Sequence, residues 1–286
     1  MKLSDLLELL LLAALWGASF LLMRIAVPVL DPVWLIELRV AIAGIVLSLL
    51  LIRLNLVNEI RSHLLPLFIL GGLNSAIPFL LFAFAALYLP AGFSAILNAT
   101  APLFGTLITC LWLKERLTRS GLLGLIAGFA GVIVLVGWTN IPITVSFVGA
   151  TMAGLLAAFM YAIAAFYAKE KLSRVPSMAI ATGTQLSAAI ILLPLTPFFL
   201  PTAPVSLEVI TVVLALALFS TALAYILYFR LISNIGVANA LTVAYLIPLF
   251  AMFWGAAILK EPITLSMLFG CGLILGGTAI AVSKKA

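Results

Sequence analysis

The side chains in this sequence that could bind a ligand are polar and aromatic residues set inside long apolar segments. In hydrocarbon a polar side chain is costly and usually faces the interior of a helix bundle. The amides Asn74, Asn98 and Gln185 are the most informative, because a helix backbone cannot satisfy an amide completely. They either join neighbouring helices or contact a ligand. The predicted substrate-binding residues are Trp16, Ser19, Phe20, Asn74, Ser75, Phe79, Ser94, Asn98, Tyr161, Gln185, Thr221, Tyr225, Tyr228 and Tyr245.

An aromatic wall with a few amides suits a small solute that has an apolar or aromatic side chain and a polar backbone. Two other interpretations stay open. The serines and threonines can hydrogen-bond the backbone of their own helix. Core packing competes with cavity lining for Trp16, Tyr161 and Tyr245, which the sequence places near the middle of the membrane.

Few charges accompany these residues. Glu37 and Arg39 lie in the outer half of segment 32–52, and Arg24 lies at the outer end of segment 6–27. These three either pair with one another, or Arg39 meets a substrate carboxylate, or Glu37 carries a coupling proton. There is no basic cluster in mid-membrane of the kind that a phosphorylated ligand would favour.

Catalysis and metal binding are not favoured. The chain has one histidine, His63, and two cysteines, Cys110 and Cys271, with no metal-ligand spacing between them. No paired acids and no nucleophile with a base occur at a plausible depth, which argues against an enzyme. We therefore expect no metal and no cofactor. The small basic cluster Lys114, Arg116 and Arg119 does not indicate a nucleic-acid partner.

The elements that must position these residues are membrane-spanning helices. Charged residues make up 8% of the 286 residues, against about 25% in soluble domains. A span needs roughly 20 mostly apolar residues. Ten such segments follow one another with short connections: 6–27, 32–52, 65–87, 91–113, 121–137, 147–168, 177–197, 207–231, 236–259 and 264–282.

The basic residues support this count and predict an orientation. Counted along the ten segments, twelve of the 15 basic residues fall on the side of the N-terminus. The positive-inside rule makes that side cytoplasmic, and both termini with it. The twelve are Lys2, Arg53, Arg61, Lys114, Arg116, Arg119, Lys169, Lys171, Arg174, Arg230, Lys284 and Lys285.

An internal repeat divides the chain into 1–140 and 141–286. The runs Pro102-Leu103-Phe104 and Leu113-Lys114-Glu115, followed by two glycines, return 146 residues later from Pro248 onward. Because each unit holds five segments, the second enters the membrane inverted. Inverted repeats are typical of transporters, which hold substrate near the midplane between the repeats. The alternative is simple duplication of a scaffold.

These motifs resemble a known family. Leu15-Trp16-Gly17-Ala18-Ser19-Phe20, the two repeated runs and Leu259-Lys260-Glu261-Pro262 are similar to the EamA-type ten-helix members of the drug/metabolite transporter superfamily, and among them to bacterial exporters of amino acids, including aromatic ones. The resemblance implies a basket of helices around a central cavity, with alternating access. The related small multidrug pumps carry a central glutamate in their first helix. Its absence here argues against proton antiport of cationic drugs.

The expected fold is therefore an all-α membrane protein with ten transmembrane helices, arranged as two inverted five-helix repeats around a central cavity. Pro102 and Pro248 are predicted hinges, because a proline inside a helix removes one backbone hydrogen bond. Gly124 and Gly128, together with Gly272 and Gly276, are predicted to bring segments 121–137 and 264–282 into close contact.

The predicted function is export of small neutral or zwitterionic metabolites, chiefly amino acids, by uniport across a bacterial inner membrane. The partners are the small-molecule substrate and the lipid bilayer, and the protein is expected to be a monomer or a weak homodimer. One alternative is a proton-coupled exporter of other metabolites or drugs. An alternative of another class is a non-transporting receptor or assembly subunit, which should lack a water-accessible cavity at the midplane.

Overall fold

The computed structural model describes residues 2–111, 118–139, 141–201 and 203–282, and in those ranges its regular structure is helical throughout. The repeated run Leu113-Lys114-Glu115, together with Arg116, Lys284 and Lys285, lies outside the described residues. The structure therefore does not test the predictions that involve these residues.

The first helix, α1 (Leu3–Arg53), contains two membrane-length segments joined at Asp31. Asp31 has φ 67° and ψ 149°, a backbone conformation that side chains rarely adopt, so the helix direction changes there. Its carboxylate accepts a hydrogen bond from the Val33 backbone N–H at 2.9 Å and so begins the second segment. The two helices predicted for 6–27 and 32–52 are thereby confirmed.

The remaining helices follow in the predicted order. They are α2 (Val57–Ser62), α3 (Leu64–Gly71), the π-helical turn η1 (Gly72–Ala76), α4 (Ile77–Ala86), α5 (Ala91–Asn98), α6 (Ala101–Leu111), α7 (Arg119–Gly137), α8 (Val145–Lys171), α9 (Ser177–Leu192), the 3₁₀ turn η2 (Leu193–Phe198), α10 (Leu207–Ala217), the π-helical turn η3 (Leu218–Leu223), α11 (Ala224–Ile235), α12 (Val237–Ala240), α13 (Val243–Leu259) and α14 (Leu265–Val282).

These helices form ten membrane-length segments. Eight continuous helical stretches are long and apolar enough to cross a membrane, and one of them is α1, which contains two segments. The shorter apolar helix α13, preceded by α12, completes the ten. The protein is therefore a ten-helix, multi-pass membrane protein with two repeats, as the sequence predicts.

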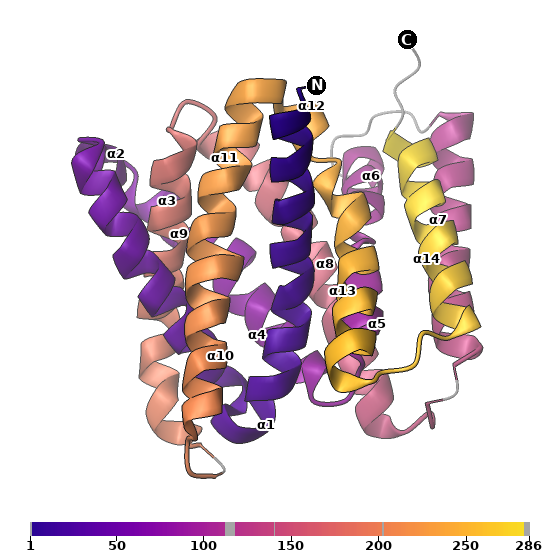
Figure 1. Ribbon diagram of the computed structural model, residues 1–286. Coiled ribbons are helices and arrows are strands. Elements are labelled where there is room, and N and C mark those ends of the chain that lie inside the picture. Colours follow the sequence, from indigo (N-terminus) through magenta and orange to yellow (C-terminus); the bar gives the residue numbers. More distant parts are fainter. Residues whose placement is uncertain (1, 112–117, 140, 202, 283–286) are drawn as a thin grey trace.

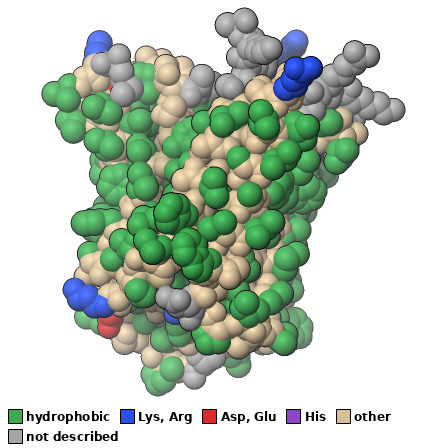
Figure 2. All heavy atoms as spheres, turned by 90° about the vertical axis from the view of Figure 1, so that its right-hand side faces the viewer, with side chains coloured by type: hydrophobic (Ala, Val, Ile, Leu, Met, Phe, Trp, Pro, Cys, Tyr) green, Lys and Arg blue, Asp and Glu red, His purple; other side chains and the backbone are tan. Residues whose placement is uncertain are grey.

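The molecule has two ends, which we name by the chain. The terminal face is where α1 begins and α14 ends, and the distal face is the opposite end (Figure 1). Seen from the side of α7 and α14, hydrophobic side chains cover the middle, and Lys and Arg side chains appear toward the two ends (Figure 2). A surface of this kind suits a hydrocarbon environment.

Close packing of α7 against α14 joins the two repeats. A Cβ atom added to Gly131 would lie 2.9 Å from the carbonyl oxygen of Gly270, and one added to Gly277 would lie 2.6 Å from that of Gly124. Gly124 and Gly270 are 146 residues apart, as are Gly131 and Gly277. Each repeat thus contributes the same pair of positions to this contact.

The predicted contact between these two helices is confirmed, but the glycines chosen on α14 were wrong. No atom lies within 4 Å of a Cβ added to Gly272 or Gly276. Gly270 and Gly277 are seven residues apart and share one face of a helix, whereas Gly272 is turned about 200° from Gly270. Gly272 and Gly276 therefore belong to the outward side.

The two repeated prolines have different surroundings. The segment 91–113 is interrupted between Asn98 and Ala101, and Pro102 is the second residue of α6, where its missing N–H costs no helical hydrogen bond. The helix α13 continues through Pro248, and the interruption in this segment lies earlier, between Ala240 and Val243. A helix break accompanies Pro102 as predicted, but none occurs at Pro248.

Candidate functional site

Two π-helical turns place polar residues in the middle of the bundle. The turn η1 contains Asn74 and Ser75, and the turn η3 contains Ser220 and Thr221. The two turns begin 146 residues apart, the same offset as the repeat in the sequence. A π-helical turn inserts a wider step into a helix and is frequent at functional sites.

Two hydrogen bonds at matching positions connect the repeats. The Arg39 Nε atom donates to the Thr221 hydroxyl at 2.9 Å, and the Gln185 Nε2 atom donates to the Ser75 hydroxyl at 3.0 Å. Arg39 and Gln185 are 146 residues apart, and so are Ser75 and Thr221. Each repeat thus supplies one donor and one acceptor to the other, as two inverted copies related by a two-fold axis require.

Arg39 is buried without an acidic partner. It is 4% exposed, its guanidinium carbon lies 3.8 Å from the centroid of the Phe79 ring, and its Nη1 atom lies 3.7 Å from the Met23 sulfur. Among the described residues, no carboxylate lies within 4 Å of it. The ring contact stabilises the cation but does not neutralise it.

The predicted pairing among Arg24, Glu37 and Arg39 is wrong. Glu37 and Arg39 are two residues apart on one helix, so their side chains point about 200° away from each other. Glu37 is 7% exposed, and its Oε2 atom has no hydrogen-bond partner among the described residues. Arg24 pairs instead with Glu261.

Aromatic rings surround this polar centre. Trp16 lies 5.3 Å from Tyr228 and 6.4 Å from Tyr225, measured between ring centroids. On another side, Phe82 lies 5.4 Å from Phe20 and 6.2 Å from Tyr161. Four segments, from α1, α4, α8 and α11, therefore contribute rings to one region.

Polar interactions connect these rings to the centre. Tyr161 and Tyr225 both interact electrostatically with Arg39, and the Tyr225 hydroxyl interacts with Asn74 and Ser75. Tyr161 and Tyr225 are only partly buried, so each keeps part of its surface accessible. We define the central site as Arg39, Asn74, Ser75, Tyr161, Gln185, Thr221 and Tyr225, with the neighbouring rings of Trp16, Phe20, Phe79, Phe82 and Tyr228.

For several predicted residues, the described part of the chain shows no polar or ring contact with this centre. Ser19 is buried in α1. Ser94 is buried in α5, and its hydroxyl has no partner among the described residues. Asn98 is the half-buried last residue of α5, and Tyr245 lies in the first turn of α13, close to the terminal face and not in mid-membrane. Their role in substrate binding stays a prediction.

Phe82 was missed, although the repeat could have found it. Phe82 is 146 residues before Tyr228, and Phe79 is 146 residues before Tyr225. Phe79, Tyr225 and Tyr228 are all predicted binding residues, so the constant offset would have added Phe82 as the fourth member of this set.

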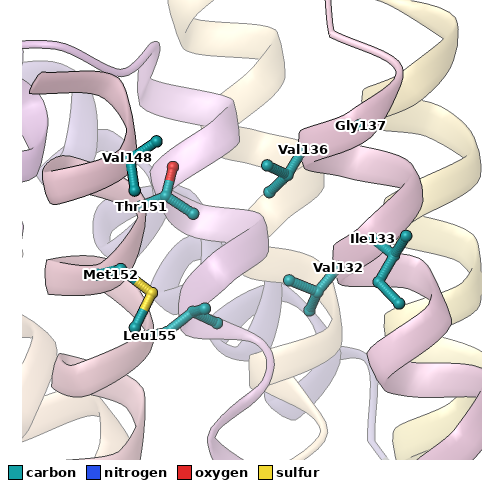
Figure 3. A pocket seen from close by; sticks show the side chains of 8 residues that line it. All are labelled: Val132, Ile133, Val136, Gly137, Val148, Thr151, Met152 and Leu155. Atoms are coloured by element: carbon teal, nitrogen blue, oxygen red, sulfur yellow. The ribbon is translucent and has the colours of Figure 1, made fainter. Parts of the chain in front are cut away.

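A separate apolar cavity of about 360 Å³ lies between α7 and α8 (Figure 3). Aliphatic side chains such as Val132, Val136 and Leu155 form its wall, together with Met152. The Thr151 hydroxyl is the polar side-chain group of this lining and has no partner among the described residues. Such a wall offers little to a zwitterion, so this cavity is not the candidate substrate site.

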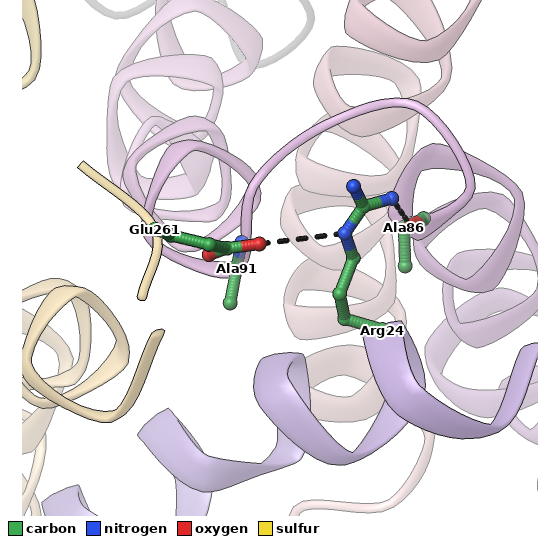
Figure 4. A network of polar contacts seen from close by, with 4 residues as sticks. All are labelled: Arg24, Ala86, Ala91 and Glu261. Carbon is green, nitrogen blue, oxygen red and sulfur yellow. Dashed lines mark hydrogen bonds and ion pairs between the residues drawn. The ribbon is translucent and has the colours of Figure 1, made fainter. Parts of the chain in front are cut away.

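Four residues form polar contacts between the repeats at the distal face (Figure 4). The Arg24 Nη1 atom donates to the Ala86 carbonyl oxygen at 2.6 Å, and its Nε atom donates to the Glu261 Oε1 atom at 3.4 Å. The other carboxylate oxygen of Glu261 accepts from the Ala91 backbone N–H at 2.9 Å. We call these contacts the distal latch, because they join α1, the α4–α5 connection and the residues after α13.

The segments around the latch separate toward the terminal face. Near the distal face α5 meets α13, where a Cβ atom added to Gly92 would lie 3.1 Å from the Met252 Cα atom. Farther along, α6 turns to α7 and α8, since the Phe104 ring lies 5.6 Å from both Phe129 and Phe159. The start of α13 packs instead against α1 and α11 through Val243.

The described residues contain no group of three or more His, Cys, Asp or Glu side chains that could hold a metal ion.

The model of a protein family described as "EamA-like transporter family" matches residues 4–137 and 148–283. The match covers most of the chain and both repeats. The chain belongs to the EamA-like transporter family.

Relatives of this EamA-like transporter carry transporter names. An uncharacterized transporter of Archaeoglobus fulgidus is 26% identical over 94% of this chain and 95% of its own. A probable amino-acid metabolite efflux pump of Salmonella typhimurium is 25% identical over 96% and 93%. A probable terminal-alkyne amino-acid exporter of Streptantibioticus cattleyicolor is 26% identical over 83% and 79%. The protein is a membrane transporter, and these names confirm that it is not an enzyme.

A crystal structure titled only "Crystal structure of protein" superimposes with a TM-score of 0.68, covering 99% of this chain and 97% of that one at 20% identity. At this identity the likeness establishes the fold alone. It supports the arrangement of the ten helices described above.

Proposed function

We propose that this EamA-like transporter exports small zwitterionic metabolites with apolar or aromatic side chains, most simply amino acids, by alternating access. The observation that supports this proposal is the central site between the two repeats. There, aromatic rings surround one buried cation and several hydroxyl and amide groups. A ring-lined space with few polar groups suits an apolar side chain attached to a polar backbone. Two of the relatives carry names for amino-acid export, which supports the same choice.

The proposed membrane is a bacterial inner membrane, with the terminal face in the cytoplasm. Among the described residues, the basic side chains of the terminal face outnumber those of the distal face, which holds Arg24 and Lys260, and this is the positive-inside pattern. With the distal latch closed and α6 turned away from α13, this state would receive substrate from the cytoplasm. We place the boundary between the five-helix units at residues 140 and 141, and we propose a monomer or weak homodimer.

Flux measurements test the proposal. Purified protein in liposomes should release labelled phenylalanine, tryptophan and leucine down their gradients faster than protein-free liposomes, with arginine and glutamate much slower. The reason is that a ring-lined site offers no partner for the additional side-chain charge that arginine and glutamate carry. Tryptophan flux should fall about tenfold in Trp16→Ala, because a lost ring contact and lost apolar burial are together worth at least about 1.4 kcal/mol. Absence of amino-acid flux, beside an active control exporter, would point to the receptor or assembly alternative.

Proton coupling is the second candidate, and Glu37 is the observation that favours it. A buried carboxylate with an unpartnered oxygen is typical of a group that binds and releases a proton in mid-membrane. The same liposomes with an imposed pH gradient decide between the two. A uniporter gives no accumulation against the amino-acid gradient, and Glu37→Gln keeps its flux. A coupled exporter accumulates substrate and loses that ability in Glu37→Gln.

A further inference from the structure

We propose that Arg39 binds the carboxylate group of the transported solute. This inference rests on the proposed function, since it assigns the recognition of one part of a zwitterion to one side chain. Nothing in the relatives' names identifies such a residue. The argument comes from the charge, the free donors and the internal symmetry of the site.

Arg39 lacks the acidic partner that two other arginines have. Arg24 has Glu261, and the more exposed Arg230 has Glu8 at 2.9 Å. Arg39 is more buried than either, and its partners in the described chain are a hydroxyl, a sulfur and an aromatic face. A cation without a counter-ion is costly to bury within a membrane protein. An anionic group of the substrate would remove much of that cost.

The guanidinium also keeps donors for a ligand. Its Nε atom is engaged by Thr221, and its Nη1 atom has only the long contact to the Met23 sulfur. The Nη2 atom has no acceptor among the described residues. It is also not completely enclosed by protein. The outer edge of the guanidinium is therefore available for a carboxylate, which it can bind through two parallel hydrogen bonds.

The other repeat makes the matching contact without a charge. There a neutral amide, Gln185, donates to Ser75 over a similar distance. A glutamine at position 39 could therefore brace Thr221 and η3 without the cost of a buried cation. The charge at Arg39 must serve something outside the packing of the two repeats, and the neighbouring rings of Tyr161 and Tyr225 place it beside the proposed solute.

The test compares ligands with and without a carboxylate. Phenylalanine, 3-phenylpropionate and phenylalanine amide are measured for binding, by thermal stabilisation of the detergent-solubilised protein, and for flux in liposomes. The variants are Arg39→Gln, which copies the neutral repeat, and Arg39→Lys, which keeps the charge. Arg61→Gln is the matched control, because Arg61 is an exposed arginine on α2.

The wild-type protein and Arg61→Gln should bind phenylalanine and 3-phenylpropionate about 10–100-fold better than the amide, as expected for hydrogen bonds to a charged group. Arg39→Gln should lose this preference while binding the amide at least as well as the wild-type protein does, because a like charge is removed, and Arg39→Lys should recover part of the preference. An equal loss for all three ligands in a folded Arg39→Gln variant, or wild-type binding without preference for a carboxylate, would overturn the proposal. Arg39-dependent binding of carboxylates without any flux would preserve it and reject the transport of amino acids instead.

Discussion

Replacing Gly124 by leucine should leave little correctly folded protein. At Gly124 the backbone atoms of Gly277 and Ala281 occupy the place of any side chain, so α7 and α14 would have to move apart. Backbone atoms cannot rotate away as a side-chain end can. We expect a loss of roughly 3 kcal/mol, the upper range for overpacking. Fluorescence-detected gel filtration after heating in detergent measures the fraction that stays monodisperse.

Gly272→Leu is the matched control for this prediction. It adds the same side chain to the same helix pair, at a position with open space within 4 Å. That face of α14 is exposed, where leucine suits the hydrocarbon, so the variant should behave like the wild-type protein. Equal stability of Gly124→Leu and Gly272→Leu would contradict the contact between α7 and α14 described here.

Removing the Glu261 carboxylate should open the distal face. Glu261→Ala deletes both the ion pair with Arg24 and the hydrogen bond from the Ala91 N–H. The latch is partly exposed, so we discount the ion pair for solvent screening and expect about 1–2 kcal/mol in total. That shift makes states open to the distal side about tenfold more populated. Access from that side is the quantity to measure.

The variant Phe20→Cys, made in a protein whose Cys110 and Cys271 are replaced by serine, measures this access. Phe20 lies one helical turn from both Trp16 and Arg24 on the same face of α1, between the central site and the latch. A membrane-impermeant thiol reagent applied to the distal side should label it about tenfold faster in Glu261→Ala. Glu208→Ala is the control, since Glu208 is exposed at the distal start of α10. Unchanged labelling, or the same rise in the control, would rule out a latch at Glu261.

The two repeats differ in where the proline-containing segment is interrupted. The segment with Pro102 is broken next to that proline, whereas the segment with Pro248 is broken two residues before α13 begins. Under the proposed mechanism, the two repeats would exchange these shapes when access changes from one face to the other. The hinge role of both prolines remains a prediction.

Much of the architecture could be predicted from the residues alone. The ten segments, the two repeats and the choice of Trp16, Tyr161, Tyr225 and Tyr228 as candidate residues depend on local properties, namely how apolar a stretch is and which residue types occur within it. Such properties are read along the chain. The constant offset of 146 then connects one repeat to the other without knowledge of any contact.

The partners of individual side chains were decided only by the tertiary structure. Arg24 meets Glu261, 237 residues away, and Arg39 meets Thr221, 182 residues away, while Glu37 has neither arginine as a partner. On α14, Gly270 and Gly277 form the contact with α7. Gly272 and Gly276 do not, although their four-residue spacing is that of a helix-packing motif. A sequence shows how many faces a helix could use for packing. Which face is used depends on the helix that lies against it, and that is a property of the assembled bundle.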